Sequence, residues 1–135
     1  FAFFGAISSA LWTVFHHEAA SKVNPIVGAI IVSIFAMILG AIIFSFKYQA
    51  SALVISKKGL LFLALVGVAA FASDYFALRT FASDLPVSIG GPILIGGGVA
   101  LAATIGVIMG ETLTWQIGVG IILVTVGASL IAYIR

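Results

Sequence analysis

The chain has 135 residues, of which 63% are hydrophobic and 7% are charged, and its formal net charge is +2. Soluble globular domains carry about 25% charged residues, so this composition excludes a water-soluble fold, and the small net charge does not indicate nucleic-acid binding. The absence of cysteine excludes disulfides, thiolate metal sites and a cysteine nucleophile. The composition therefore predicts an integral membrane protein.

Five long apolar runs predict five membrane-spanning helices, over about residues 3–20, 26–46, 59–79, 85–109 and 112–134. A helix needs about 20 mainly apolar residues, at 1.5 Å rise each, to cross the hydrocarbon core. A transmembrane barrel would show alternating apolar and polar residues, and the second run does not. We therefore expect an all-α integral membrane fold with a single five-helix domain over residues 1–135.

Turn residues mark the boundaries of these helices. Asn24-Pro25 is typical of a helix start, because asparagine caps the free N–H groups and proline lacks the N–H that would be unsatisfied. The segment 83–86, Ser-Asp-Leu-Pro, predicts the same kind of start for the fourth helix. We expect Glu111 to lie at the start of the fifth helix, where the helix dipole favours negative charge.

The basic residues do not choose an orientation. With five spans, three lysines share one side of the membrane and three basic residues share the other: Lys47, Lys57 and Lys58 against Lys22, Arg79 and Arg135. Orientation follows an excess of Lys and Arg on the cytoplasmic side. The chain opens at Phe1 without methionine, so we expect a few residues before it. Either those residues carry the basic side chains that decide the orientation, or the protein inserts both ways up and forms an antiparallel pair. The first run has no basic leader, so we expect no cleaved signal peptide.

Five short motifs follow one another in a characteristic order along the chain. They are Ser9-Ala10-Leu11-Trp12, then residues 20–25 (ASKVNP), then residues 74–79 (DYFALR), then Pro92 with Gly110-Glu111, and finally residues 113–118 (LTWQIG). With this order and spacing the chain resembles an EamA-like domain of the drug/metabolite transporter superfamily over essentially its full length.

The resemblance implies one half of a ten-helix, inverted-repeat transporter. Relatives commonly carry two five-helix units in one chain, and an odd number of helices turns the second unit upside down around a midplane site. A chain with one unit would then act as a homodimer, and the balanced basic residues allow an antiparallel one. The family commonly has lysine where this chain has Glu18, so the resemblance does not indicate a particular substrate.

Glu18 and Asp74 are the carboxylates that fall within the predicted spans. An ionisable side chain inside the membrane costs about 2.5–3.5 kcal/mol on insertion scales, so it indicates a functional site. Both residues are expected at similar depth, toward the side of Lys22. Two such carboxylates could share a proton near neutral pH and exchange it for a cation. Alternatively, Glu18 lies at the interface, and Asp74 bonds a neighbouring helix or pairs with Arg79 or Lys22.

Other residues are weaker candidates for the substrate or proton site. His16, His17 and Glu18 are adjacent, so on a helix they point about 100° apart and do not predict a metal site, whose helical ligands lie three or four residues apart. His17 is either a proton relay or an interfacial polar group. Trp12 and Tyr75 could line a cavity for a cationic or apolar substrate, although aromatic residues in spans more often pack or face lipid.

The fourth predicted helix is rich in glycine and contains a proline. Pro92 frees the carbonyl of residue 88. Gly91 directly precedes it, and Gly97 follows five residues later. These residues predict either a flexible element that rocks during transport or a surface for close helix packing.

These observations favour a transporter subunit that moves a small metabolite or organic cation by alternating access, coupled to protons, as a homodimer in a prokaryotic plasma membrane. The alternative is a non-transporting structural or accessory subunit of a larger membrane complex. An enzyme is not expected, because the sequence lacks nucleophile–base and metal-ligand spacings. We expect a small-molecule substrate and the lipid bilayer as partners, and no cofactor.

Overall fold

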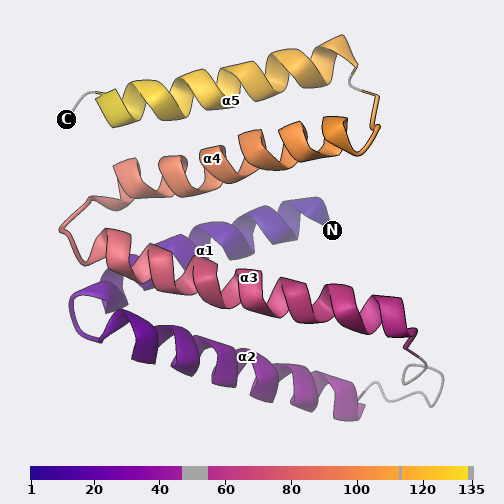
Figure 1. Ribbon diagram of the computed structural model, residues 1–135. Coiled ribbons are helices and arrows are strands. Elements are labelled where there is room, and N and C mark those ends of the chain that lie inside the picture. The colour runs from indigo at the N-terminus through magenta and orange to yellow at the C-terminus, as the bar shows by residue number, and fades with distance from the viewer. Residues whose placement is uncertain (47–54, 113, 134–135) are drawn as a thin grey trace. The chain divides into compact units, whose positions relative to one another are not determined.

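A computed structural model describes residues 1–46, 55–112 and 114–133, and in these ranges the chain is all-α (Figure 1). Its five helices are α1 (Ala2–Ala20), α2 (Pro25–Phe46), α3 (Lys57–Phe81), α4 (Val87–Ile108) and α5 (Trp115–Tyr133). The five predicted helices are thereby confirmed. Lys47 and Arg135, used above to compare the two membrane sides, lie outside the described residues.

Four of the five helices, α2 to α5, are long and apolar enough to cross a membrane. This agrees with a multi-pass membrane protein. The exception is α1, although it has 19 residues. Its apolar stretch ends at Phe15, because His16, His17 and Glu18 occupy its last turns. The two histidines and the glutamate lower the hydropathy of any window long enough to span the hydrocarbon core.

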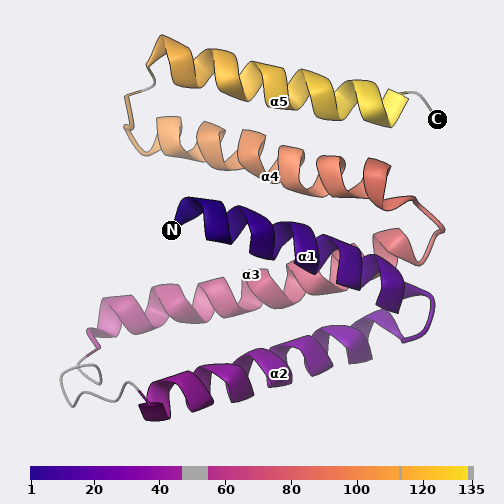
Figure 2. The ribbon, with the colours of Figure 1, turned by 180° about the vertical axis from the view of Figure 1, so that it is seen from behind.

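The sequence predicts one domain, and the helices group into two compact units, residues 1–14 with 84–135 and residues 15–83. In the first unit α4 and α5 form an antiparallel hairpin, and in the second α2 and α3 form another (Figures 1 and 2). Antiparallel packing of consecutive helices is typical of helix bundles. The break between the units falls within α1.

Buried residues of the unit 15–83 gather where α1 ends, α2 begins and α3 ends. They are His16, Ala20, Gly28, Ala29, Asp74, Ala77, Leu78 and Phe81. Glycine at position 28 lets α2 lie close to α3. A Cβ atom at this position would be only 2.5 Å from Cδ1 of Leu78. Close approach over small residues is typical of membrane helices, which gain packing contacts in this way.

Glycines of α4 make the close contacts in the other unit. A Cβ atom at Gly96 would lie 2.9 Å from Cβ of Ala128 in α5, and one at Gly91 would lie 3.1 Å from Cγ2 of Thr13 in α1. By contrast, no residue of α5 itself is buried. Most of the surface of α5 is therefore left for lipid or for a partner.

The predicted start of α2 is confirmed. Pro25 is its first residue, and the N–H of Ile26 donates to Oδ1 of Asn24 at 3.0 Å. The start of α3 lies two residues earlier than predicted, at Lys57, because the Ser56 hydroxyl accepts from the N–H of Gly59 at 3.0 Å and caps the helix there.

Two predictions about helix boundaries are wrong. Helix α4 begins at Val87, with Pro86 as its cap residue and no capping side chain. Asp84 instead lies in the turn with a positive φ of 58°, a conformation that aspartate tolerates better than most residues. Helix α5 begins at Trp115, so Glu111 does not start it.

Glu111 belongs to the end of α4. Its N–H donates to the Gly106 carbonyl at 3.0 Å, and the N–H of Gly110 donates to the Val107 carbonyl at 2.9 Å. Gly110 has a positive φ of 92°. This pair of bonds, around a glycine with left-handed backbone, is the Schellman ending of a helix. It satisfies two carbonyls that would otherwise be unpaired in a membrane-spanning helix.

Candidate functional site

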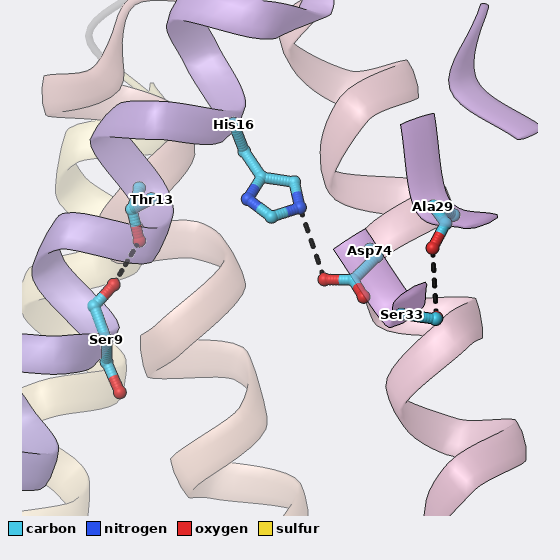
Figure 3. A network of polar contacts seen from close by, with 6 residues as sticks. All are labelled: Ser9, Thr13, His16, Ala29, Ser33 and Asp74. Atoms are coloured by element: carbon cyan, nitrogen blue, oxygen red, sulfur yellow. Dashed lines mark hydrogen bonds and ion pairs between the residues drawn. The ribbon is translucent and has the colours of Figure 1, made fainter. Parts of the chain in front are cut away.

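A buried histidine–carboxylate pair lies in the unit 15–83. Nε2 of His16, on α1, is 3.1 Å from Oδ1 of Asp74, on α3, and the exposed fractions of the two side chains are 4% and 10% (Figure 3). The distance is that of an ion pair when the histidine is protonated. An imidazole can accept or donate a proton and a carboxylate can accept one, so the pair brings two ionisable groups together.

Helical periodicity explains why both side chains face inward. On α1, the buried residues Thr13, His16 and Ala20 are three and four positions apart and therefore share one face. On α3, the buried residues Asp74, Ala77, Leu78 and Phe81 follow the same spacing. The alanines at 20, 29 and 77 are small, so the helix backbones can come close enough for the short aspartate to meet the imidazole.

Hydroxyl groups on the neighbouring turns bond within their own helices. The Thr13 hydroxyl donates to the Ser9 carbonyl at 2.9 Å, and the Ser33 hydroxyl donates to the Ala29 carbonyl at 2.9 Å (Figure 3). This back-bonding satisfies hydroxyl donors in an apolar environment. The proton of each hydroxyl is therefore committed locally.

Glu18 lies in a different environment from Asp74. Its side chain is 66% exposed, and its carboxylate oxygens lie 3.6 Å from Nζ of Lys22 and 3.6 Å from Nδ1 of His17. Asp74 is buried against His16. The sequence suggested a site shared by the two acids, but their burial and their ion pairs differ. Glu18 pairs with residues of its own helix, and an exposed pair one helical turn apart adds little stability.

The remaining polar candidate of this unit is His17. Its ring packs edge-on against Phe81, with ring centres 5.5 Å apart. Its side chain is one-third exposed, so it lies between the buried residues and the surface. This placement leaves both predicted roles of His17, proton relay and interfacial group, open to test.

The two predicted aromatic residues are both half-buried. The hydroxyl oxygen of Tyr75 accepts a hydrogen bond from Nη1 of Arg79 at 2.9 Å, and the Tyr75 ring meets Phe76 edge-on at 5.1 Å. Tyr75 therefore orients the basic residue near the end of α3. Trp12 is on α1, in the part that belongs to the unit with α4 and α5.

The predicted hinge residues of α4 differ in their surroundings. Gly91 is buried against Thr13, Pro92 is half-buried within the helix, and Gly97 is exposed, with open space where a Cβ atom would be. Gly91 is therefore a packing position, as one alternative predicted. Gly97 makes no packing contact of this kind, and as a glycine it leaves the backbone of α4 free to change conformation.

Within the described ranges, no three histidine, aspartate or glutamate side chains come together in a way that could hold a metal ion. Two apolar grooves lie on the unit with α4 and α5. One, of about 260 Å³, is lined by Ala103, Thr104, Val107, Ile108 and Ile121. The other, of about 340 Å³, is lined by Thr125, Val126, Ser129, Leu130 and Tyr133. Neither groove includes a predicted site residue.

His16 is the site residue that the sequence prediction missed. The adjacent run His16-His17-Glu18 led to the prediction of His17 and Glu18 as site residues. A signal was present in the spacing of Ser9, Thr13, His16 and Ala20, which forms a small and polar stripe along one face of an otherwise apolar helix. Polar groups on such a stripe are expected to face protein rather than lipid.

Comparisons of this chain with protein-family models, with curated proteins and with solved structures found no match. The fold and the His16–Asp74 pair are therefore the basis for proposing a function.

Proposed function

We propose that this chain is a subunit of a membrane transporter that moves a small metabolite or organic cation by alternating access, coupled to protons. The observation that carries the proposal is the buried pair of His16 and Asp74, 3.1 Å apart. Histidine is the side chain whose protonation changes near neutral pH. Proton relays in pumps and transporters use such acid and histidine groups inside the membrane.

The cost of burial supports a functional role for the pair. Removing two charged groups from water is expensive, and apolar residues of similar volume are often at least as stable in their place. A chain with 7% charged residues has nevertheless placed two ionisable groups against each other. In the proposed cycle, the pair takes up a proton on one side of the membrane and releases it on the other, and the exchange drives the substrate step.

The proposed functional unit is a homodimer in the cell membrane. Five helices, α1 included, would each cross the bilayer, so a second copy in the opposite orientation would supply the inverted half. The largely exposed surface of α5 leaves room for a partner. A single cysteine at the exposed Ser83 tests this, since the chain has no native cysteine. An impermeant reagent is expected to label part of the protein in intact cells and the rest only after the membrane is opened. Labelling of all of the protein or of none of it in intact cells would contradict the antiparallel dimer.

Transport is tested in liposomes that contain the purified protein and a pH-sensitive dye. Quaternary ammonium ions, amines, amino acids and small organic acids are added one at a time across an imposed pH gradient. At least one compound is expected to cause proton movement that empty liposomes do not show. Asp74→Asn and His16→Gln should abolish the proton movement, because each removes one of the two groups that exchange the proton.

The matched control is Asp84→Asn. Asp84 is an exposed carboxylate in the turn before α4, and asparagine tolerates its backbone conformation, so transport should be unchanged. Glu18→Gln separates two mechanisms: a loss of coupling would assign Glu18 to the proton pathway, and normal coupling would leave the pathway to the buried pair. Proton movement that survives both pair substitutions would refute the proposal.

The second candidate function is an accessory subunit of a larger membrane complex. It is favoured by the absence of buried residues on α5. In such a complex, the exposed surface of α5 would pack against other subunits. In that case the pair would only join α1 to α3. The pair substitutions would then lower stability, and no compound would move protons through the purified protein.

A further inference from the structure

Helix α4 contains a proline, Pro92, near its start. Proline has no N–H, so the Ser88 carbonyl lacks its usual bond within the helix, and the ring crowds this turn. Sharp bends in helices occur at such positions. Gly97 and Gly98 follow within the next two turns, with open space around both. The backbone after Pro92 is therefore easier to deform than an ordinary helix.

The segment before Pro92 is packed on α1. Gly91 is buried, as is Thr13, and a Cβ atom at Gly91 would lie 3.1 Å from Cγ2 of Thr13. The Thr13 hydroxyl is bonded to the Ser9 carbonyl, which holds the side chain in one rotamer. The first turn of α4 and this part of α1 therefore form a close contact.

The segment after Pro92 is packed on a different helix. Gly96 is buried against α5, where its Cβ atom would lie 2.9 Å from Cβ of Ala128 and 3.6 Å from Cγ1 of Val124. Ala128 has no flexible side chain that could move aside, so the two backbones are close. The two contacts of α4 thus lie on either side of Pro92 and join it to different helices.

We propose that α4 moves as two segments, with Val87–Gly91 following α1 and Ile93–Ile108 following α5, and with Pro92 as the hinge between them. This deepens the proposed function, because rocking of one helical group against another is the step that alternating access needs. A bend change of about 20° would move Leu101, about 14 Å along the axis from Pro92, by about 5 Å relative to α1.

The test uses pairs of spin labels on exposed positions, in liposomes, and does not depend on transport. Labels are placed at introduced cysteines in four combinations, two within a proposed segment group (Leu11 with Ser88, Leu101 with Leu123) and two across the hinge (Leu11 with Leu101, Ser88 with Leu123). Pulsed electron paramagnetic resonance then gives the distribution of distances for each pair.

The expected result is a single narrow distance for the two pairs within a group and a broad or double distribution for the two pairs across the hinge. Pro92→Ala restores the N–H bond to Ser88 and should remove the second distance. Ile93→Ala, a neighbouring change that leaves the backbone bonds intact, should keep it. Equal widths in all four pairs, or a distribution unchanged by Pro92→Ala, would refute the hinge and leave the proposed transport function to be decided by its own assay.

Discussion

Of the ion pairs described above, the pair of His16 and Asp74 is the buried one. The distance between its Nε2 and Oδ1 atoms is 3.1 Å. The contact joins α1 to α3 within the unit 15–83. In an apolar protein interior, the energy of such a pair depends on both partners being present, because either group alone is a desolvated charge or dipole. This dependence can be measured.

The first prediction concerns removal of one partner of this pair. His16→Leu should lower the free energy of unfolding by about 3–5 kcal/mol at neutral pH, because the buried Asp74 carboxylate loses its ion pair with His16. Unfolding in mixed micelles of increasing SDS content, followed by tryptophan fluorescence, gives these energies.

The control for this experiment is Glu18→Leu, which removes an exposed ion pair and should cost less than about 1 kcal/mol. The double variant His16→Leu with Asp74→Leu should recover much of the lost stability, because neither member of the pair is then left buried without the other. Additive losses from the two single changes would mean that the two side chains do not interact.

The second prediction concerns the approach of α2 to α3 at Gly28. A Cβ atom at Gly28 would lie 2.5 Å from Cδ1 of Leu78, a side chain that is fully buried. Gly28→Ala should therefore destabilise the protein by about 1–3 kcal/mol, the usual cost of overpacking. Gly40→Ala is the control in the same helix, because nothing lies within 4 Å of a Cβ atom there, and it should be neutral or slightly stabilising. If Gly28→Ala costs as much with Leu78→Ala as without it, the proposed clash is not the cause.

The third prediction concerns the end of α4. Gly110 has a φ of 92°, and a side chain in left-handed backbone costs about 1–2 kcal/mol. Gly110→Ala should lower the unfolding free energy by about that amount, and Gly110→Asn should cost less, because asparagine tolerates this conformation. Gly97→Ala, at an open helical position, should cause no loss. Equal stability of the alanine variants at 97 and 110 would contradict the Schellman ending.

The fourth prediction concerns the cap of α2. Asn24 accepts a hydrogen bond from the N–H of Ile26 at 3.0 Å. Asn24→Ala should cost about 1 kcal/mol in the same unfolding assay, and Asn24→Asp should retain most of the stability, because aspartate caps equally well. A loss of the same size for both variants would indicate that the amide, and not the capping oxygen, is what matters.

The helices and their starts were largely predictable from the sequence, with instructive exceptions. Asn24-Pro25 begins α2 as expected, because capping involves residues that are neighbours in the chain. Asp84 and Glu111 carry the residue types of a helix start but do not act as one. At Glu111, the positive φ of Gly110 lets the chain close α4 first, and the preference of a side chain alone does not reveal that backbone choice.

Length, hydropathy and cap residues determined that this chain is all-α with apolar helices long enough to span a membrane, because these properties depend on residues within about 20 positions of each other. Packing decided that His16 is the partner of Asp74, that Glu18 is exposed, and that Gly28 lies against Leu78. These contacts join residues far apart in the chain. They depend on the rotation of each helix about its own axis, which nearly uniform apolar sequences leave undetermined until the helices meet.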